Sequence, residues 1–193
     1  MSTDTPSGPS DGPTRAELAA RVAELEDELA ELEEDIAAAQ TQDKMVIVAT
    51  QGTLDMAYPP LILASTAAAF GYDVTVFHTF WGLEILHEDH ASDLSMSAVG
   101  NPNLSVPNAV AALPGMDAVT SRMMRQKIDD ENVASIEELI ETSLDAGVDL
   151  QACQMTMDLF DYDETEFFDG VTTGVGAATA FQEMANADVQ LLV

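Results

Sequence analysis

The sequence contains a single cysteine, Cys153, among its 193 residues. One cysteine excludes an intramolecular disulfide and leaves no second thiol for a Cys-x-x-Cys motif or a cysteine-rich zinc site. Such sparing use of cysteine is typical of proteins of a reducing cytoplasm, and the amino terminus has no apolar stretch of the kind that directs export. We therefore expect a cytoplasmic protein in which any cysteine chemistry depends on one side chain.

Basic residues are also scarce, because six Lys and Arg stand against 35 Asp and Glu and give a formal net charge of −29. Nucleic acids and anionic membranes are poor partners for such a surface, since phosphate binding needs clustered Lys and Arg. Hydrophobic residues nevertheless make up 47% of the chain, which indicates a folded body with an acidic surface. The carboxylates repel one another unless salt screens them, and in ~1 M salt the Debye length is roughly 3 Å. We therefore expect a halophilic source.

Long hydrophobic runs are absent as well. The longest apolar run, at about 61–70, is too short and too rich in alanine to span a bilayer. We therefore expect no stable membrane insertion. The length of the chain suits one domain with an appendage.

The appendage is predicted at the amino terminus. Residues 1–13 lack apolar spacing and predict a disordered lead-in, and residues 14–42 predict an acidic helix. In this helix apolar residues recur in the a/d pattern of a coiled coil: Leu18, Val22, Leu25, Leu29, Leu32, Ile36 and Ala39. We expect a homo-oligomer that assembles through this helix. An amphipathic helix laid against the rest of the chain is the alternative.

Residues 44–193 predict an α/β domain. The apolar run at 45–50 is typical of a strand buried on both faces of a parallel sheet, and a second strand is predicted at 72–78. Between them we expect a helix that carries Pro59 and Pro60 in its first turn. A strand, a helix and a strand in this order form a right-handed βαβ unit. The fold class is therefore α/β, with a doubly wound, mostly parallel, flavodoxin- or Rossmann-like sheet.

Downstream, residues 88–114 are rich in Ser, Asn and Pro and predict a lid, an interface arm or a mobile segment. Ser135 and Glu138 have the spacing of a capping box at the start of a helix. The remaining predicted elements are helices at 116–128, 135–146, 163–168 and 174–186 and strands at 148–153 and 188–193.

Cys153 is the main candidate for chemistry. Apolar and polar residues alternate before it, which predicts a strand that places Cys153 at its carboxyl end. Ligands and reactive groups lie at that edge in open α/β sheets, and a helix amino terminus or a nearby cation favours the thiolate. An inert, buried cysteine is the alternative.

Six further residues are candidates for the pocket or for a partner surface. Phe80 and Trp81 follow the second strand and would lie at the same sheet edge as Cys153, although core anchoring explains them equally well. Two methionines follow the thiol and would share its side only if the strand continued, and two arginines form part of the one cluster of cations: Met155, Met157, Arg122 and Arg125.

Two other patterns are weaker. Glu84, His87 and His90 have the side chains of metal ligands but lack a convincing set, so a solvated helix end is the preferred interpretation and we predict no metal. Gly174 and Gly176 resemble a phosphate loop, but such glycines usually allow a helix to approach a strand closely. We therefore predict no nucleotide and no other cofactor.

Four separated motifs resemble the DsrE/DsrF-like family, and in particular its larger single-cysteine branch, often labelled peroxiredoxin-like. The motifs are Gly52-Thr-Leu-Asp-Met-Ala-Tyr-Pro-Pro60, Phe77-His-Thr-Phe-Trp-Gly-Leu83, Leu113-Pro-Gly-Met116, and Gly147 to Leu159 with Ala-Cys-Gln-Met-Thr-Met-Asp. The resemblance covers residues 45–193 and implies a doubly wound α/β fold, homo-oligomers and a cysteine, here Cys153, that carries sulfane sulfur as a persulfide. Rhodanese-type and TusA-type proteins are the implied partners.

The resulting hypothesis is a sulfurtransferase-like carrier in which Cys153 accepts sulfur from one persulfide and passes it to another thiol. Two alternatives remain open. Cys153 of a thiol peroxidase or redox sensor would be oxidised to a sulfenic acid and would need an external resolving thiol. A non-catalytic oligomeric scaffold would use only the coiled coil.

Overall fold

The computed structural model describes residues 14–40, 43–97 and 116–193, which belong to two units, Met1–Gln42 and Asp43–Val193. The described part of the first unit is the helix α1 (Arg15–Gln40). Its amino terminus has a capping box, because Glu17 N–H donates to Thr14 Oγ1 at 3.2 Å and Thr14 N–H donates to Glu17 Oε2 at 2.7 Å. The predicted helix is present, and its assembly into a coiled coil stays a prediction.

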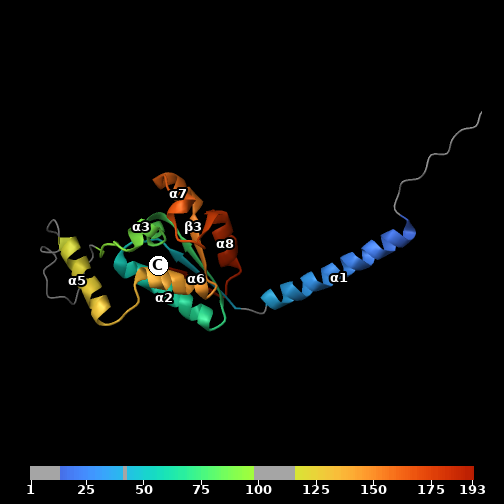
Figure 1. Ribbon diagram of the computed structural model, residues 1–193, viewed down its shortest axis with the longest axis horizontal. Coiled ribbons are helices and arrows are strands. Elements are labelled where there is room, and N and C mark those ends of the chain that lie inside the picture. The colour runs from blue at the N-terminus through green and yellow to red at the C-terminus, as the bar shows by residue number, and fades with distance from the viewer. Residues whose placement is uncertain (1–13, 41–42, 98–115) are drawn as a thin grey trace, which may run out of the picture. The chain divides into compact units, whose positions relative to one another are not determined.

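The second unit contains a five-stranded parallel sheet (Figure 1). Its order is β4-β3-β2-β1-β5. The strands are β1 (Lys44–Ala49), β2 (Asp73–His78), β3 (Asp149–Cys153), β4 (Thr172–Val175) and β5 (Val189–Leu192). The chain steps outward from β1 to β4 and then returns to the far side of β1, so the sheet is doubly wound. This confirms the predicted fold class.

Helices connect the strands. They are α2 (Leu54–Ala69), α3 (Glu88–Ala91), α5 (Met116–Asp130), α6 (Ile136–Asp145), α7 (Gln154–Phe160) and α8 (Ala177–Ala185), with 3₁₀ helices η1 (Phe80–Ile85) and η2 (Glu164–Glu166). Helices α2 and α6 pack on each other. Because right-handed crossovers in opposite directions lie on opposite faces, α8 covers the other face of the sheet.

The two faces differ in polarity. The face under α2 and α6 carries fully buried apolar side chains such as Ile47, Val76 and Leu150. On the α8 face the buried Thr75 donates from Oγ1 to Glu183 Oε2 at 3.0 Å. Lys44 Nζ lies 2.9 Å from the same carboxylate. The apolar face therefore supplies most of the hydrophobic stabilisation, and polar contacts help to attach α8.

The predicted start of the first helix of this unit is wrong. Helix α2 begins at Leu54, so Pro59 and Pro60 lie inside the helix and not in its first turn. Each proline lacks the N–H that would bond to the carbonyl four residues earlier. The bonds are lost near the start of a helix whose buried face, including Leu61 and Ala64, packs into the core. Tertiary burial therefore outweighs the local penalty.

The carboxyl-terminal third contains two elements that the pattern did not predict. Helix α7 begins directly after Cys153, and β4 occupies Thr172–Val175, where a helix was predicted from Gly174. Only η2 forms within the predicted helix at 163–168. The capping box of Ser135 and Glu138 is confirmed at the start of α6. Most of the segment predicted as a lid, interface arm or mobile region lies outside the described residues.

Candidate functional site

The site is built around Cys153, the last residue of β3 and the residue that caps the amino terminus of α7. Its side chain is only 1% exposed. The register of the sheet pairs Ala152 with His78, so the turn that follows β2 lies beside the start of α7. The thiol therefore lies between the turn after β2 and the start of α7. This place is at the carboxyl edge of the sheet, where the strand pattern predicted it.

The surroundings of Cys153 favour its anion. Burial by itself would raise the pKa of the thiol, but hydrogen bonding from the Thr156 and Thr79 hydroxyls and from the N–H groups of Thr156 and Met155 outweighs it and lowers the pKa. The side chain of Cys153 makes no capping bond to α7. The donors therefore act on the thiolate, which is a stronger hydrogen-bond acceptor than the thiol. A thiolate is the nucleophilic form of cysteine.

The two threonines belong to one small network. Thr79 Oγ1 and Thr156 Oγ1 are 3.3 Å apart, and the Phe80 N–H donates to Thr156 Oγ1 at 3.2 Å. Phe80 has a φ of +49°, in the left-handed region that residues other than glycine rarely adopt. The bond to Thr156 therefore fixes a strained turn between β2 and η1 against the first turn of α7.

Two glycines allow η1 to lie close to the end of β1. A Cβ atom added to Gly82 would come within 2.3 Å of the Ala49 carbonyl oxygen, and one added to Gly52 would come within 2.0 Å of the Trp81 carbonyl oxygen. No side chain could be accommodated at either place without moving the backbone. Both glycines belong to the motifs of the family resemblance. Their role is to let the turn that borders the thiol pack closely against the end of β1 and the loop that follows it.

The apolar candidates fall into buried and exposed groups. Trp81 and Met155 are each 61% exposed, and Phe80 is 48% exposed. Trp81 stacks on Phe160 of α7 with ring centroids 5.2 Å apart. Met157 is buried in the core. The chain turns into a helix after Cys153, so the two methionines do not continue the strand on one side of the thiol.

The arginine candidates lie on α5. The Arg125 guanidinium donates from Nη2 to the Leu94 carbonyl oxygen at 2.7 Å and lies 3.2 Å from Asp93 Oδ1. Arg122 is exposed. In Figure 1 α5 lies apart from α7, and only hydrogen bonds lower the pKa of Cys153. The structure does not bring these two arginines to the thiol, and their part in a partner surface stays a prediction.

Glu84 of η1 lies together with His87 and His90. His90 Nδ1 lies 2.6 Å from Glu84 Oε2, and the Tyr162 hydroxyl donates to Glu84 Oε1 at 2.7 Å. The rings of His87 and His90 stack with centroids 3.8 Å apart. His87 is buried and caps α3, so the expectation of a solvated helix end is wrong for this residue. Within the described ranges no group of His, Cys, Asp and Glu has the arrangement of a metal site.

Gly174 and Gly176 do not form the close approach expected of them, because a Cβ atom at either would meet nothing within 4 Å. Gly174 lies in β4 with a φ of +74°, and its N–H donates to Gln154 Oε1 at 3.1 Å. Gly176 caps α8. The run is therefore the end of a strand and the start of a helix.

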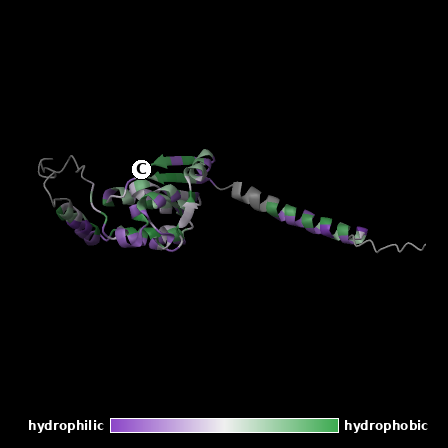
Figure 2. Ribbon diagram, turned by 90° about the horizontal axis from the view of Figure 1, so that it is seen from above, coloured by the Kyte–Doolittle hydropathy of each residue, from purple (hydrophilic) through white to green (hydrophobic). Residues whose placement is uncertain are grey.

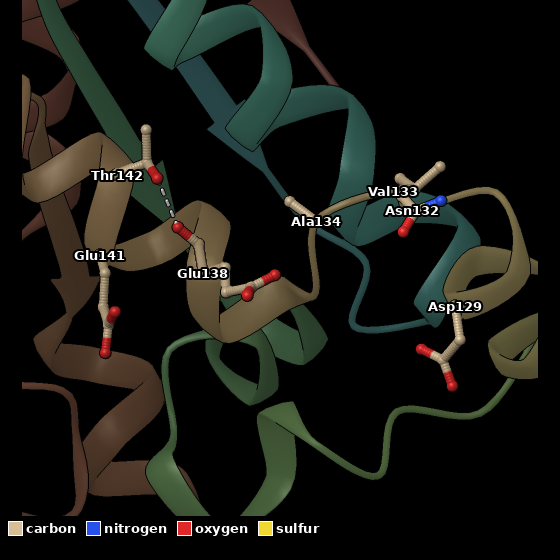
Figure 3. A pocket seen from close by; sticks show the side chains of 7 residues that line it. All are labelled: Asp129, Asn132, Val133, Ala134, Glu138, Glu141 and Thr142. Carbon is tan, nitrogen blue, oxygen red and sulfur yellow. Dashed lines mark hydrogen bonds between the residues drawn. The ribbon is translucent and has the colours of Figure 1, made fainter.

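A surface concavity of about 650 Å³ lies away from the thiol, between the end of α5 and α6 (Figure 3). Its acidic lining comes from Asp129, Glu138 and Glu141, and Thr142 Oγ1 donates to the Glu138 carbonyl oxygen at 2.7 Å. No lining residue belongs to β3, η1 or α7, and we assign it no part in the chemistry of Cys153.

Among the described helices, none is both long enough and apolar enough to cross a membrane.

Thr79 and Thr156 were not among the residues that the sequence singled out. One indication was present, because Thr156 stands three residues after Cys153, the spacing at which a residue in the first turn of a helix faces its cap. Nothing in the local pattern links Thr79 to Cys153.

The fold and the site define a class of protein: an open, doubly wound parallel α/β domain with a buried thiol between the end of a strand and the start of a helix. The model of the DsrE/DsrF/DrsH-like family matches residues 41–192. This chain belongs to that family, which confirms the resemblance to the DsrE/DsrF-like family, while its place in the larger single-cysteine branch stays a prediction.

Two relatives support this assignment, and one solved structure gives a weaker match. The chain is 46% identical over 160 residues to the sulfur carrier protein DsrE2 of Allochromatium vinosum, a match that covers 79% of this chain and 99% of that protein. It is 30% identical over 152 residues to the uncharacterized protein YrkE of Bacillus subtilis, with 76% and 95% covered. The crystal structure of the ychN protein from E. coli is 14% identical, with a TM-score of 0.47, and the match covers 79% of this chain and 100% of that one.

Proposed function

We propose that this chain is a sulfur-trafficking protein that carries sulfane sulfur as a persulfide on Cys153. Its similarity to the sulfur carrier protein DsrE2 of Allochromatium vinosum supports the general role. The structural observation that carries the proposal is the place of the buried Cys153 between the end of β3 and the start of α7, where hydroxyl and N–H groups lower the pKa of its thiol. These donors stabilise the anionic form that sulfur exchange requires.

Loading is a thiol exchange. The Cys153 thiolate attacks the outer sulfur of a donor persulfide, a new sulfur–sulfur bond forms, and the donor leaves as its thiolate. The outer sulfur keeps its oxidation level and is passed from one thiol to another. Since only sulfur–sulfur bonds form and break, the exchange needs no metal ion and no organic cofactor.

The same residues serve release. When an acceptor thiolate attacks the outer sulfur, the leaving group is the Cys153 thiolate, and a stabilised thiolate leaves more readily. The donors from Thr79, Thr156 and the first turn of α7 therefore assist both directions of transfer. Because Cys153 is 1% exposed, the side chains that cover it must move aside when a partner thiol approaches.

The partners we propose are rhodanese-type and TusA-type sulfur-transfer proteins in a cytoplasm. We also propose that the chain assembles with itself through α1, whose leucines lie exposed along one seam. The proposal assigns the chemistry to residues 44–193 and the self-association to residues 14–42.

The direct test is the intact mass of the protein after incubation with polysulfide. We expect one or two added sulfur atoms, about 32 Da each, which dithiothreitol removes, and no such adduct on Cys153→Ser. An equal adduct on the serine variant would overturn the proposal. Incubation with peroxide in place of polysulfide tests the peroxidase or sensor hypothesis. That hypothesis predicts a sulfenic acid at Cys153 and no added sulfur.

The second test concerns the threonine donors. Thr79→Val removes one hydroxyl that lowers the pKa of Cys153, so we expect slower loading at pH 7, by roughly threefold, and recovery as the pH rises and the thiol ionises. Thr142→Val is the matched control, since Thr142 lies on α6 and its hydroxyl bonds to the Glu138 carbonyl oxygen. If the pH profiles of Thr79→Val and the parent coincide, the hydroxyl has no part in ionising Cys153.

A further inference from the structure

The surface beside Cys153 is apolar and exposed. It consists of Phe80 and Trp81 on η1 and Met155, Leu159 and the half-buried Phe160 on α7, and we call it the thiol rim. Trp81, Met155 and Leu159 are each about 60% exposed, and the two elements are in contact. Clusters of large exposed apolar side chains mark surfaces that bind another molecule.

The thiol rim is rigid where it borders the thiol. Trp81 is held by stacking on Phe160 with an interplanar angle of 18°. The Phe80 N–H is fixed by Thr156 at 3.2 Å. A tryptophan that is already ordered loses little conformational entropy on binding, which is one reason why tryptophan dominates the energetics of many interfaces.

The charges that accompany the thiol rim are all of one sign. Residues 79–85 and 154–166, which form η1, α7 and the segment through η2, contain no Lys, Arg or His. They contain six carboxylates: Glu84, which already accepts from the Tyr162 hydroxyl, and the exposed Asp158, Asp161, Asp163, Glu164 and Glu166. A partner that covers the apolar residues therefore meets an acidic border.

We propose that the thiol rim is the docking surface for a partner protein whose own reactive cysteine lies in an apolar face bordered by Lys and Arg. The proposal rests on the proposed function, because the partner must bring its thiol to Cys153. Charge complementarity selects the partner. Two copies of this chain packed rim to rim would place the same carboxylates against each other, whereas a basic face neutralises them and is drawn toward the thiol.

The reaction at the docked complex is balanced. The partner thiolate attacks the outer sulfur of the Cys153 persulfide, the bond between that sulfur and Cys153 Sγ breaks, and Cys153 is left as the thiolate. The proton of the persulfide stays with the transferred sulfur, so no oxidant or reductant is consumed.

The test uses full-length protein loaded with polysulfide and three acceptor thiols. Two are cysteine peptides of equal length and apolar content, one flanked by lysines and arginines and the other by glutamates. The third is dithiothreitol, which is small and uncharged. At about 0.15 M salt we expect sulfur transfer to the cationic peptide to be about tenfold faster than to the anionic one, and we expect this ratio to fall toward one at about 1 M salt.

Variants locate the surface. The double variant Trp81→Ala/Leu159→Ala should lower transfer to the cationic peptide by about tenfold relative to transfer to dithiothreitol. Phe70→Ala is the matched control, because Phe70 is 80% exposed but follows α2 at the opposite edge of the sheet. It should change neither rate.

The outcomes separate the two proposals. If polysulfide does not load Cys153, or if dithiothreitol does not release the sulfur, the proposed function fails. If loading and release occur but both peptides accept sulfur equally, or if the double variant transfers at the parental rate, the docking surface is wrong. If the double variant instead lowers the particle mass measured by light scattering, the thiol rim is a contact between copies of this chain, which also overturns the inference.

Discussion

Helix α1 and the α/β unit use the same kinds of apolar residue with opposite results. In α1, Leu25 is 42% exposed and Leu29 is 57% exposed, whereas Leu61 and Leu150 of the α/β unit are fully buried. Figure 2 shows hydrophobic and hydrophilic residues alternating along α1, while the strands are mostly hydrophobic. Apolar residues are therefore regularly spaced in both regions, but only the α/β unit buries them in a core.

The difference follows from geometry. A parallel sheet has two faces and its own crossover helices cover them, so the α/β unit supplies both sides of its core. A helix with an a/d seam supplies one side only, and the other must come from another element, which in a coiled coil is a second helix. Periodicity thus shows that a residue can be buried, and tertiary structure decides whether the chain itself provides the cover.

The strongest test of this comparison is removal of residues 1–42. If α1 makes the contacts between copies, we expect a lower particle mass by light scattering in about 1 M salt, where carboxylate repulsion is screened. We expect the α/β unit to stay folded, with an unchanged denaturation midpoint, because its core lies within residues 43–193. An unchanged particle mass would show that α1 does not hold copies together.

Matched leucine truncations sharpen the comparison. Leu150→Ala removes a fully buried side chain and should lower the free energy of unfolding of the α/β unit by about 2–5 kcal/mol. Leu25→Ala makes the same chemical change on α1 and should leave this free energy within about 0.5 kcal/mol of the parent. Guanidinium denaturation in constant salt measures both. Equal losses would mean that the two regions share one core.

The smallest expected effect comes from the two capping boxes. Ser135→Ala removes the acceptor for the Glu138 N–H at the start of α6, and we expect the α/β unit to lose about 1 kcal/mol of stability. Thr14→Ala removes the equivalent acceptor for the Glu17 N–H on α1. It should lower helicity measured by circular dichroism without changing the unfolding of the α/β unit. A loss of α/β stability in Thr14→Ala would contradict the separation of the two regions.

The sequence by itself determined the elements whose information is local. Alternation placed Cys153 at the end of a strand, the spacing of Ser135 and Glu138 predicted a capping box, and the apolar run at 45–50 predicted a buried strand. These patterns repeat every two to four residues, which is the range over which backbone geometry relates neighbouring side chains. Motifs with glycines at 52 and 82 indicated the family, although not why those glycines are required.

Tertiary structure decided what depends on distant contacts. Pro59 and Pro60 lie inside α2 because burial of its apolar face outweighs two missing backbone bonds. Arg125 is tied to the Leu94 carbonyl oxygen, 31 positions away along the chain. Thr79 and Thr156, which help to lower the pKa of Cys153, are 77 positions apart and meet only because β2 and β3 are neighbours in the sheet. Sequence spacing predicts which residue ends a strand, but only the pairing of strands decides which hydroxyls surround its thiol.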